Sequence, residues 1–228
     1  AAEGCGVVVF LASSSLPGSS QADFAAEVEA HVGVTVRAAE ICNRVGVRRF
    51  LFASSGGAVY GIEPAAGEGL RVDMPTRPRN AYGVSKLAIE HYLRLIGDTR
   101  DMDVMTLRVA NPYGEGQRAL RGQGFVAAAM QHALEGKEMA IWGDGSVERD
   151  FVHIADVADA FVAAAAHKGG SGLWNVGSGR GVSLNAMLRE IETALGRPVP
   201  VSYGLDRPID VRRNVLDIAA TTAELGWA

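Results

Sequence analysis

The sequence predicts an α/β fold built on a parallel sheet, and three observations support this prediction. Short apolar runs alternate along the chain with segments of helical periodicity, which is the pattern of consecutive strand–helix–strand units. The first run, residues 7–12, is apolar at every position, as expected for a parallel strand buried on both faces. The chain has 228 residues, 48% of them hydrophobic, which is enough for one large domain or two modest ones.

The first half of the chain is predicted to hold three strands and two helices. The strands 7–12 and 48–53 end in serine-rich turns, and residues 50–53 of the second are apolar like the whole of the first. Between them, residues 22–45 carry apolar side chains at helical spacing. A second helix is predicted to begin after Asn80, a favourable N-cap, and to reach about residue 96. A third strand, 104–110, follows it.

The second half continues the alternation with shorter elements. Ser183 is a plausible N-cap for a helix that ends near residue 195, where Gly196 stops it. The other predicted helices are 125–134, 156–167 and 217–225, and the predicted strands are 139–142 and 173–176.

The composition narrows the function classes. A net charge of −4 argues against a nucleic-acid-binding protein, because such proteins usually carry a basic stripe. Cys5 and Cys42 are far apart and lie near no histidine cluster, so we expect neither a disulfide framework nor a metal site, and we predict a reducing, cytoplasmic compartment. No apolar run reaches the ~18–20 residues of a membrane helix, and no membrane partner is expected.

The strongest chemical signal is Tyr82 followed by Lys86. Residues at i and i+4 project from one face of a helix. A tyrosine with a pKa near ~10 is a poor base at neutral pH, but a fixed ammonium nearby would favour the phenolate and lower that pKa. The spacing alone is common by chance, and the alternative is a surface pair on an amphipathic helix.

Two further groups of residues give this pair a context. Upstream, the segment 53–61 holds Ser54 and Ser55 at the end of a predicted parallel strand, where open α/β sheets bind ligands. A hydroxyl there can bond a substrate oxygen and share its proton with a tyrosine, although a plain Ser-Gly turn is the alternative. Downstream, four motifs follow in order: 107–114 (LRVANPYG), 142–153 (WGDGSVERDFVH), 175–179 (NVGSG) and 207–210 (RPID).

In this order, the motifs resemble the extended short-chain dehydrogenase/reductases of the NAD-dependent epimerase/dehydratase family, over nearly the whole chain. The resemblance implies a Rossmann-like doubly wound parallel sheet, truncated at its N-terminus, with a smaller α/β substrate-binding domain. It places the NAD-binding domain at 1–110 and 151–176 and the nucleotide-sugar-binding domain at 111–150 and 177–228.

The resemblance also implies roles for individual residues. Tyr82 matches the catalytic acid/base, Lys86 the residue that binds the nicotinamide ribose, and Ser55 the active hydroxyl, although Ser54 is an alternative. The family usually places that hydroxyl at Gly56, so the assignment to Ser55 rests on its being the nearest hydroxyl. The other residues matched to the cofactor site are Ala12, Ser13, Ala53, Ser54 and Val109.

For the substrate, the resemblance implies a UDP-sugar bound by a second set of residues. Arg149 and Arg207 match arginines that clamp the diphosphate, which suits the forked geometry of a guanidinium. The alternative for Arg149 is a structural ion pair. The remaining residues matched to substrate binding are Asn111, Ala140, Trp142 and Asp210.

The chemistry favoured by the resemblance is 4-epimerisation of UDP-glucose and UDP-galactose through a 4-keto sugar. Related dehydratases carry an Asp-Glu pair where this chain has Gly57 and Ala58, and neither can transfer a proton. Alternatives are a UDP-glucuronate decarboxylase, another UDP-sugar epimerase or dehydratase, a non-catalytic fragment, and a redox sensor, although sensors typically lose the Tyr–Lys pair.

Two expectations concern the rest of the molecule. The family opens with a strand, a Gly-rich phosphate-binding turn and a helix, and this sequence contains no such turn, so we expect a truncated chain with an unpaired sheet edge and lower stability. The resemblance further implies a homodimer through a four-helix bundle that includes 22–45 and the helix of Tyr82. His31 in the first of these segments replaces a usual asparagine, and we interpret it as a core or dimer-interface residue.

Overall fold

The computed structural model describes residues 2–13, 23–118, 124–207 and 210–227. Within them the main sheet is wholly parallel, with the strand order β1-β2-β3-β7. Its strands are β1 Val7–Phe10, β2 Arg49–Ser55, β3 Asp103–Val109 and β7 Gly172–Val176. The predicted α/β class with a parallel sheet is confirmed.

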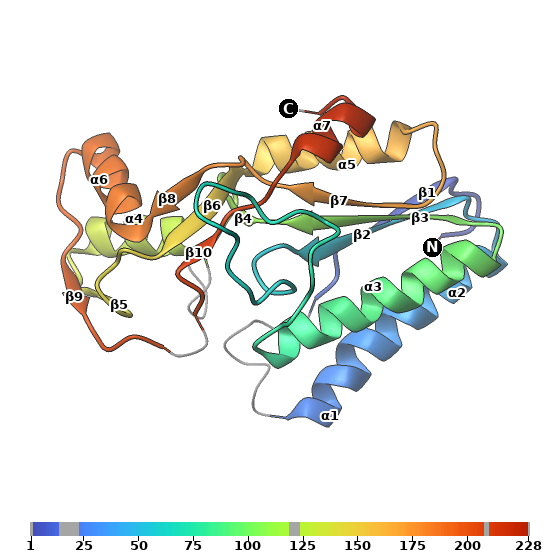
Figure 1. Cartoon of the computed structure of the whole chain (residues 1–228), viewed down its shortest axis with the longest axis horizontal. Coiled ribbons are helices and arrows are strands. Elements are labelled where there is room, and N and C mark those ends of the chain that lie inside the picture. The colour runs from blue at the N-terminus through green and yellow to red at the C-terminus, as the bar shows by residue number, and fades with distance from the viewer. Residues whose placement is uncertain (1, 14–22, 119–123, 208–209, 228) are drawn as a thin grey trace.

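Helices cover both faces of the main sheet (Figure 1), so its central strands bury alternate side chains in two cores. Phe50 and Phe52 of β2 pack toward α2 and α3, whereas Leu51 between them packs toward α5. This two-sided burial explains why the strand sequence is a continuous apolar run. The covering helices are α2 Val34–Arg44, α3 Ala81–Thr99, α5 Ile154–Ala166 and α7 Ala219–Leu225.

The predicted helix 22–45 forms as three consecutive segments. A short α1, Phe24–Glu27, leads into a π-helical stretch η1, Val28–Gly33, which continues as α2. The Asp23 side chain caps the start by accepting from the Ala26 N–H at 3.0 Å. The sequence indicated no π segment, and such segments are frequent at functional sites.

The long helix α3 begins as predicted. The Asn80 side chain accepts a hydrogen bond from the Gly83 N–H at 2.8 Å and so caps the first turn. The helix runs to Thr99, three residues beyond the predicted end. Since the cap fixes where the helix starts, it also fixes where Tyr82 and Lys86 emerge from it.

A smaller part of the molecule lies beyond the carboxyl ends of the main strands (Figure 1). In it, helices α4 and α6 pack on short strands around a third core. As predicted, Ser183 caps α6 by accepting from the Ala186 N–H at 3.1 Å. The elements are β4 Asn111–Tyr113, α4 Phe125–Glu135, β5 Met139–Ile141, β6 Glu148–His153, β8 Gly181–Ser183, α6 Leu184–Leu195, β9 Val201–Tyr203 and β10 Arg213–Asn214.

The predicted domain boundaries cut across two structural units. The boundary between 150 and 151 falls inside β6, which pairs with β4, β8 and β10. Leu216 and Trp227, predicted to belong to the sugar-binding part, pack in the same core as β3, β7 and α5. The end of the described chain therefore returns to the main sheet.

β1 forms one edge of the main sheet as far as the structure describes it. It pairs with β2 through four residues, and Val7 and Val9 are 43% and 46% exposed.

None of the helices in the described part of the chain has the length and apolar character that a membrane-spanning helix needs.

Candidate active site

A cavity of about 1190 Å³ lies between the carboxyl ends of the main strands and the smaller part of the molecule. Parallel strands all end at one edge of their sheet, so their final residues converge there. Ser55 of β2, Val109 of β3 and Val176 of β7 lie abreast in register. The cavity is therefore in the place where open α/β sheets bind ligands.

Most of the predicted site residues line this one cavity. They are Ser13, Ala53, Ser54, Ser55, Tyr82, Lys86, Val109, Asn111, Ala140, Trp142, Arg149, Arg207 and Asp210. Ala12 does not line it, whereas its neighbours Leu11 and Ser13 do, because successive residues of an extended chain point to opposite sides.

Lys86 is fixed between helix α3 and strand β2. Its Nζ donates a hydrogen bond to the Ala53 carbonyl at 2.8 Å and lies 4.7 Å from the centre of the Phe52 ring and 5.5 Å from that of Tyr82. Burial lowers the pKa of Lys86 to about 8, while the charges of Glu90 and Glu27 raise it. The lysine is thus held one helical turn from Tyr82, as the spacing predicted.

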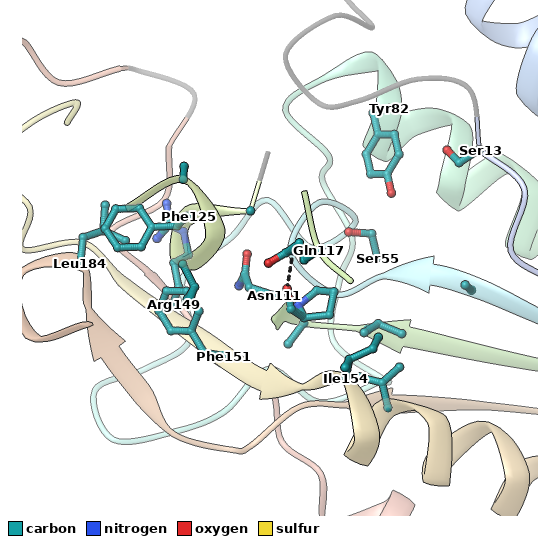
Figure 2. A pocket seen from close by; sticks show the side chains of 18 of the residues that line it. Ser13, Ser55, Tyr82, Asn111, Gln117, Phe125, Arg149, Phe151, Ile154 and Leu184 are labelled. Atoms are coloured by element: carbon teal, nitrogen blue, oxygen red, sulfur yellow. Dashed lines mark hydrogen bonds between the residues drawn. The ribbon is translucent and has the colours of Figure 1, made fainter. Parts of the chain in front are cut away.

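Tyr82 and Ser55 form the polar centre of the wall. Figure 2 shows both side chains extending into the same space, and the Ser55 hydroxyl favours the phenolate form of Tyr82 and so acts to lower the pKa of Tyr82. Burial nevertheless raises the pKa of Tyr82 above its ordinary value, because it penalises the phenolate more than Ser55 favours it. The proximity of Lys86 is therefore not enough, among the protein's own groups, to lower this pKa as the sequence suggested.

The two neighbouring serines have different partners. The Ser54 hydroxyl donates to the Glu90 carboxylate in the protein interior, and Ser54 is buried. Both serines line the cavity, but the Ser54 hydroxyl is bonded to Glu90, whereas Ser55 acts on Tyr82.

The two glycines after Ser55 have different reasons to be glycine. A Cβ on Gly56 would lie 2.6 Å from a Leu216 methyl and 3.2 Å from the Arg108 carbonyl, so packing excludes a side chain there. A Cβ on Gly57 would lie 3.9 Å from both the Ser55 hydroxyl and the Asn111 side-chain oxygen. Gly57 therefore opens onto the site, and no packing contact requires it.

Arginine and asparagine side chains come from the smaller part of the molecule. Arg149 on β6 donates from Nη1 to the carbonyls of Glu148 and Val211, both at 2.9 Å, and burial lowers its pKa. Asn111 donates to the Asp150 carbonyl at 3.0 Å. These bonds fix both side chains at the cavity wall (Figure 2), and Arg149 makes no ion pair with Asp150 or Glu148 among the described contacts.

Arg207 and Asp210 form a second polar group at the cavity. Arg207 donates to both carboxylate oxygens of Asp210, at 2.8 and 3.1 Å. Its guanidinium lies 5.6 Å from the centre of the Trp142 ring, which is 54% exposed. A flat exposed ring beside a guanidinium is suited to a ligand that combines an aromatic base with an anion.

Several contributors were missed from the sequence. Gln117 lines the cavity and donates a hydrogen bond to the Pro112 carbonyl at 3.0 Å. Phe125 and Phe151 also line the cavity (Figure 2). The buried Asp150 accepts from the Ser178 N–H and hydroxyl, the Gly179 N–H and the Leu216 N–H. The charged run Glu-Arg-Asp was a signal for Asp150, but sequence alone could not supply its partners.

The described residues fit the nicotinamide end of a dinucleotide. Lys86, Tyr82 and Ser55 surround a space that continues past Val109 to Leu11 and Ser13 at the end of β1. The sequence contains no Gly-rich phosphate-binding turn after a strand, so the remainder of such a cofactor has no matching cradle in this chain. No group of three or more metal-ligating side chains occurs in the described ranges.

Comparison with known proteins decides the family. Residues 1–177 match the model of the NAD dependent epimerase/dehydratase family. The chain belongs to this family. The family resemblance that the sequence motifs indicated is thereby confirmed.

Similar proteins include two UDP-glucose 4-epimerases. A UDP-glucose 4-epimerase of Mycolicibacterium smegmatis is 38% identical over 193 residues, which are 85% of this chain and 61% of that protein. The structure of the UDP-glucose 4-epimerase of Thermus thermophilus in complex with NAD has a TM-score of 0.90 and 31% identity, over 98% of this chain and 72% of that one.

A third similar protein has been solved with two different UDP-sugars, UDP-glucuronic acid and UDP-glucose. MoeE5 in complex with UDP-glucuronic acid and NAD also has a TM-score of 0.90 and 31% identity, over 99% of this chain and 74% of that one. The chain spans less than two thirds of the Mycolicibacterium enzyme's length.

Proposed function

We propose that this chain carries the catalytic and sugar-nucleotide-binding part of an NAD-dependent UDP-sugar 4-epimerase, with UDP-glucose and UDP-galactose as its substrates. The observation that carries the proposal is the placement of Tyr82, Ser55 and Lys86 together on the wall of a cavity that Arg149 and Asn111 also line. The similarity to UDP-glucose 4-epimerases supports the choice of substrate.

Tyr82 is the acid/base in this proposal. It takes the proton of the sugar C4 hydroxyl and later returns it, while Ser55 bonds the same oxygen and orients it. Bound NAD⁺ would supply the hydride acceptor and donor at C4 and a positive charge beside the phenol. That charge is needed because burial raises the pKa of Tyr82 in the protein's own environment. Lys86 is placed to bind the nicotinamide ribose.

The smaller part of the molecule holds the nucleotide. Arg149 and Arg207 bind the diphosphate, Asn111 bonds one of its oxygens, and the Trp142 ring and Asp210 hold the nucleoside. Arg207 then exchanges part of its bond with Asp210 for the phosphate, at little cost because Arg207 is partly exposed.

The space beside Ser55 favours epimerisation over dehydration. Dehydration requires an acid and a base next to the active hydroxyl, and Gly57 and Ala58 offer neither. The room at Gly57 permits a keto sugar to turn and to receive hydride on its other face. The UDP-glucuronic acid complex of MoeE5 supports a second candidate, an enzyme that acts on UDP-glucuronate, either its 4-epimerase or its decarboxylase.

An assay of the 228-residue chain distinguishes these candidates. With added NAD⁺, we expect UDP-galactose to be converted to UDP-glucose and no CO₂ to be released from UDP-glucuronate. Release of CO₂ would support the decarboxylase. Absence of both reactions, with no nicotinamide in the purified protein by its absorbance and fluorescence, would contradict the proposal and support a non-catalytic binding role.

We also propose that two copies of the chain associate through their helices. Apolar side chains are exposed along α1, η1, α2 and α3, which lie together on one side of the main sheet (Figure 1). Two such helical layers packed together would form a four-helix bundle. The exposed residues are Phe24, Val28, Val34, Ile41, Val84, Tyr92 and Leu95. A cytoplasmic location stays a prediction from the cysteines.

A further inference from the structure

A buried ion pair lies one helical turn beyond Lys86 and does not line the cavity. Glu90 of α3 and Arg108 of β3 are 7% and 4% exposed. Arg108 donates from Nε to both Glu90 oxygens at 3.1 Å and from Nη2 to Oε2 at 2.7 Å. The proposed reaction uses neither residue.

Three successive positions on one face of α3 interact with three consecutive residues of β2. Tyr82 interacts with Ser55, whereas Lys86 is hydrogen-bonded to the Ala53 carbonyl and Glu90 to the Ser54 hydroxyl. The helix positions are four residues apart, so their side chains lie in a row facing the strand. Glu90 is thus the inner member of the row to which the two site residues belong.

Arg108 compensates for the burial of the Glu90 carboxylate. An unpaired buried carboxylate would be strongly disfavoured, and three hydrogen bonds from a guanidinium offset that penalty. Arg108 is itself held, since its guanidinium lies 4.8 Å from the centre of the Tyr60 ring, whose hydroxyl donates to Asn175 at 2.7 Å.

The charged and titratable groups around Lys86 come from α3, α1, η1 and β3, and β2 adds two uncharged contacts. Glu90 and Tyr82 belong to α3, and Glu90 raises the pKa of Lys86 more than Glu27 of α1 does. His31 of η1 is buried, and its pKa is lowered by burial and by Lys86. Strand β3 contributes Arg108, through its bond to Glu90. Strand β2 contributes the Ala53 carbonyl and the Phe52 ring.

We propose that Glu90, held by Arg108, is a positioning residue for the Tyr82–Lys86 pair: it keeps the Lys86 ammonium charged and bound to β2 without touching substrate. The part played by Tyr82 rests on the proposed function, whereas the charge of Lys86 is a property of the chain itself. Loss of the Glu90 charge should therefore make Lys86 give up its proton at lower pH.

The test is a direct titration of Lys86. The chain has three lysines, so ¹³Cε-lysine labelling gives three NMR signals, and Lys86→Arg identifies the relevant one. We expect Glu90→Gln to lower the midpoint of Lys86 by about one pH unit or more, a tenfold loss of proton affinity, and Glu27→Gln to lower it less.

A double variant guards against two failures of the single one. Glu90→Gln leaves Arg108 unpaired, which could unfold the protein or displace the Lys86 proton by repulsion. Glu90→Gln with Arg108→Gln removes both charges. We expect the midpoint to fall in this variant too, with near-UV circular dichroism showing the native fold. An unchanged midpoint in the folded double variant would overturn the proposal.

Kinetics provide a second measurement. We expect the alkaline limb of kcat in Glu90→Gln to move to lower pH by the same amount as the NMR midpoint, with KM for UDP-galactose unchanged because Glu90 does not line the cavity. A parallel rise in KM without a shifted limb would indicate a merely structural role. If the wild-type chain turns over no UDP-sugar, the proposed function fails, and the NMR titration still decides the present inference.

Discussion

At the scale of single residues, burial determines what each polar group can do. Burial raises the pKa of Tyr82 and lowers that of Lys86 to about 8, so both groups are pushed toward their neutral forms. The Ser55 hydroxyl and the charge of Glu90 oppose these shifts. A positive charge added near Tyr82 would therefore oppose the effect of burial and lower the pKa of Tyr82.

Removal of the Tyr82 hydroxyl tests its role as acid/base. Tyr82→Phe keeps the ring that lies beside Lys86 and should lower kcat by about 10²–10⁴-fold, the usual contribution of a positioned acid/base. The measurement is UDP-galactose turnover. Tyr92→Phe, on the same helix but 52% exposed, is the matched control and should keep full activity. Equal activity of both variants would exclude Tyr82 from the chemistry.

The two glycines after Ser55 give a second prediction at this scale. Gly56→Ala should lower the free energy of unfolding by about 1–3 kcal/mol, because its methyl group would overlap Leu216. Gly57→Ala has room for the methyl group and should leave stability within about 0.5 kcal/mol of wild type. Urea denaturation of both variants measures the difference, and equal losses would contradict the distinction.

At the scale of elements, short strands depend on polar ties for their placement. Strand β6 carries Arg149 into the site, and the next residue, Asp150, joins this strand to the loop at Ser178 and to Leu216 near β10. The carboxylate of Asp150 is fully buried and accepts from four donors of the chain. This tie adds to the backbone pairing of Arg149 with Val182 of β8 and Asn214 of β10, and so helps to hold the arginine at the cavity.

Asp150→Asn should destabilise the fold by about 2–4 kcal/mol, because an amide NH₂ would face N–H donors that now share a carboxylate. We also expect a higher KM for UDP-galactose, because a shift of strand β6 would move Arg149. The same shift would move the backbone carbonyl of residue 150, to which Asn111 is bonded. Thermal and urea denaturation and steady-state kinetics measure the two effects. Asp159→Asn, on the exposed side of α5, is the control and should change neither. A wild-type stability for Asp150→Asn would refute the tie.

At the scale of the whole molecule, exposed apolar side chains form two separate surfaces. One is the helical face of α1 to α3 that we propose as a dimer contact, and the other is the edge strand β1, with Val7 and Val9 exposed. Among the described residues β1 pairs with β2 alone, and an unpaired apolar edge is a template for pairing with another chain. The two surfaces lie on different elements, so substitutions can separate specific from non-specific association.

Tyr92→Glu with Leu95→Glu should convert the proposed dimer to a monomer, because each substitution places a charge in the apolar contact between helices. Sedimentation velocity measures the oligomeric state. Leu205→Glu changes an equally apolar side chain that is 85% exposed elsewhere, and it should leave the dimer intact. Sedimentation of the wild-type chain as a monomer at micromolar concentration would rule out this interface.

The sequence by itself determined the α/β class, the strands of the main sheet, the capped helices α3 and α6, and the family. These follow from local patterns: apolar runs, caps such as Asn80 and Ser183, and the spacing of Tyr82 and Lys86. The short strands β4, β8 and β10 were not predictable, because two or three residues carry no periodicity of their own. The six-residue π segment was not predicted either, because its residues lie within one continuous helical pattern.

Only the tertiary structure decided which groups act on one another. It separated Ser54 from Ser55, showed that burial raises rather than lowers the pKa of Tyr82, and joined Glu90 to Arg108 across 18 positions of sequence. It also returned Leu216 and Trp227 to the core of the main sheet. The physical reason is that burial and electrostatic interaction depend on distance in space, which residues distant in sequence acquire only when the chain folds.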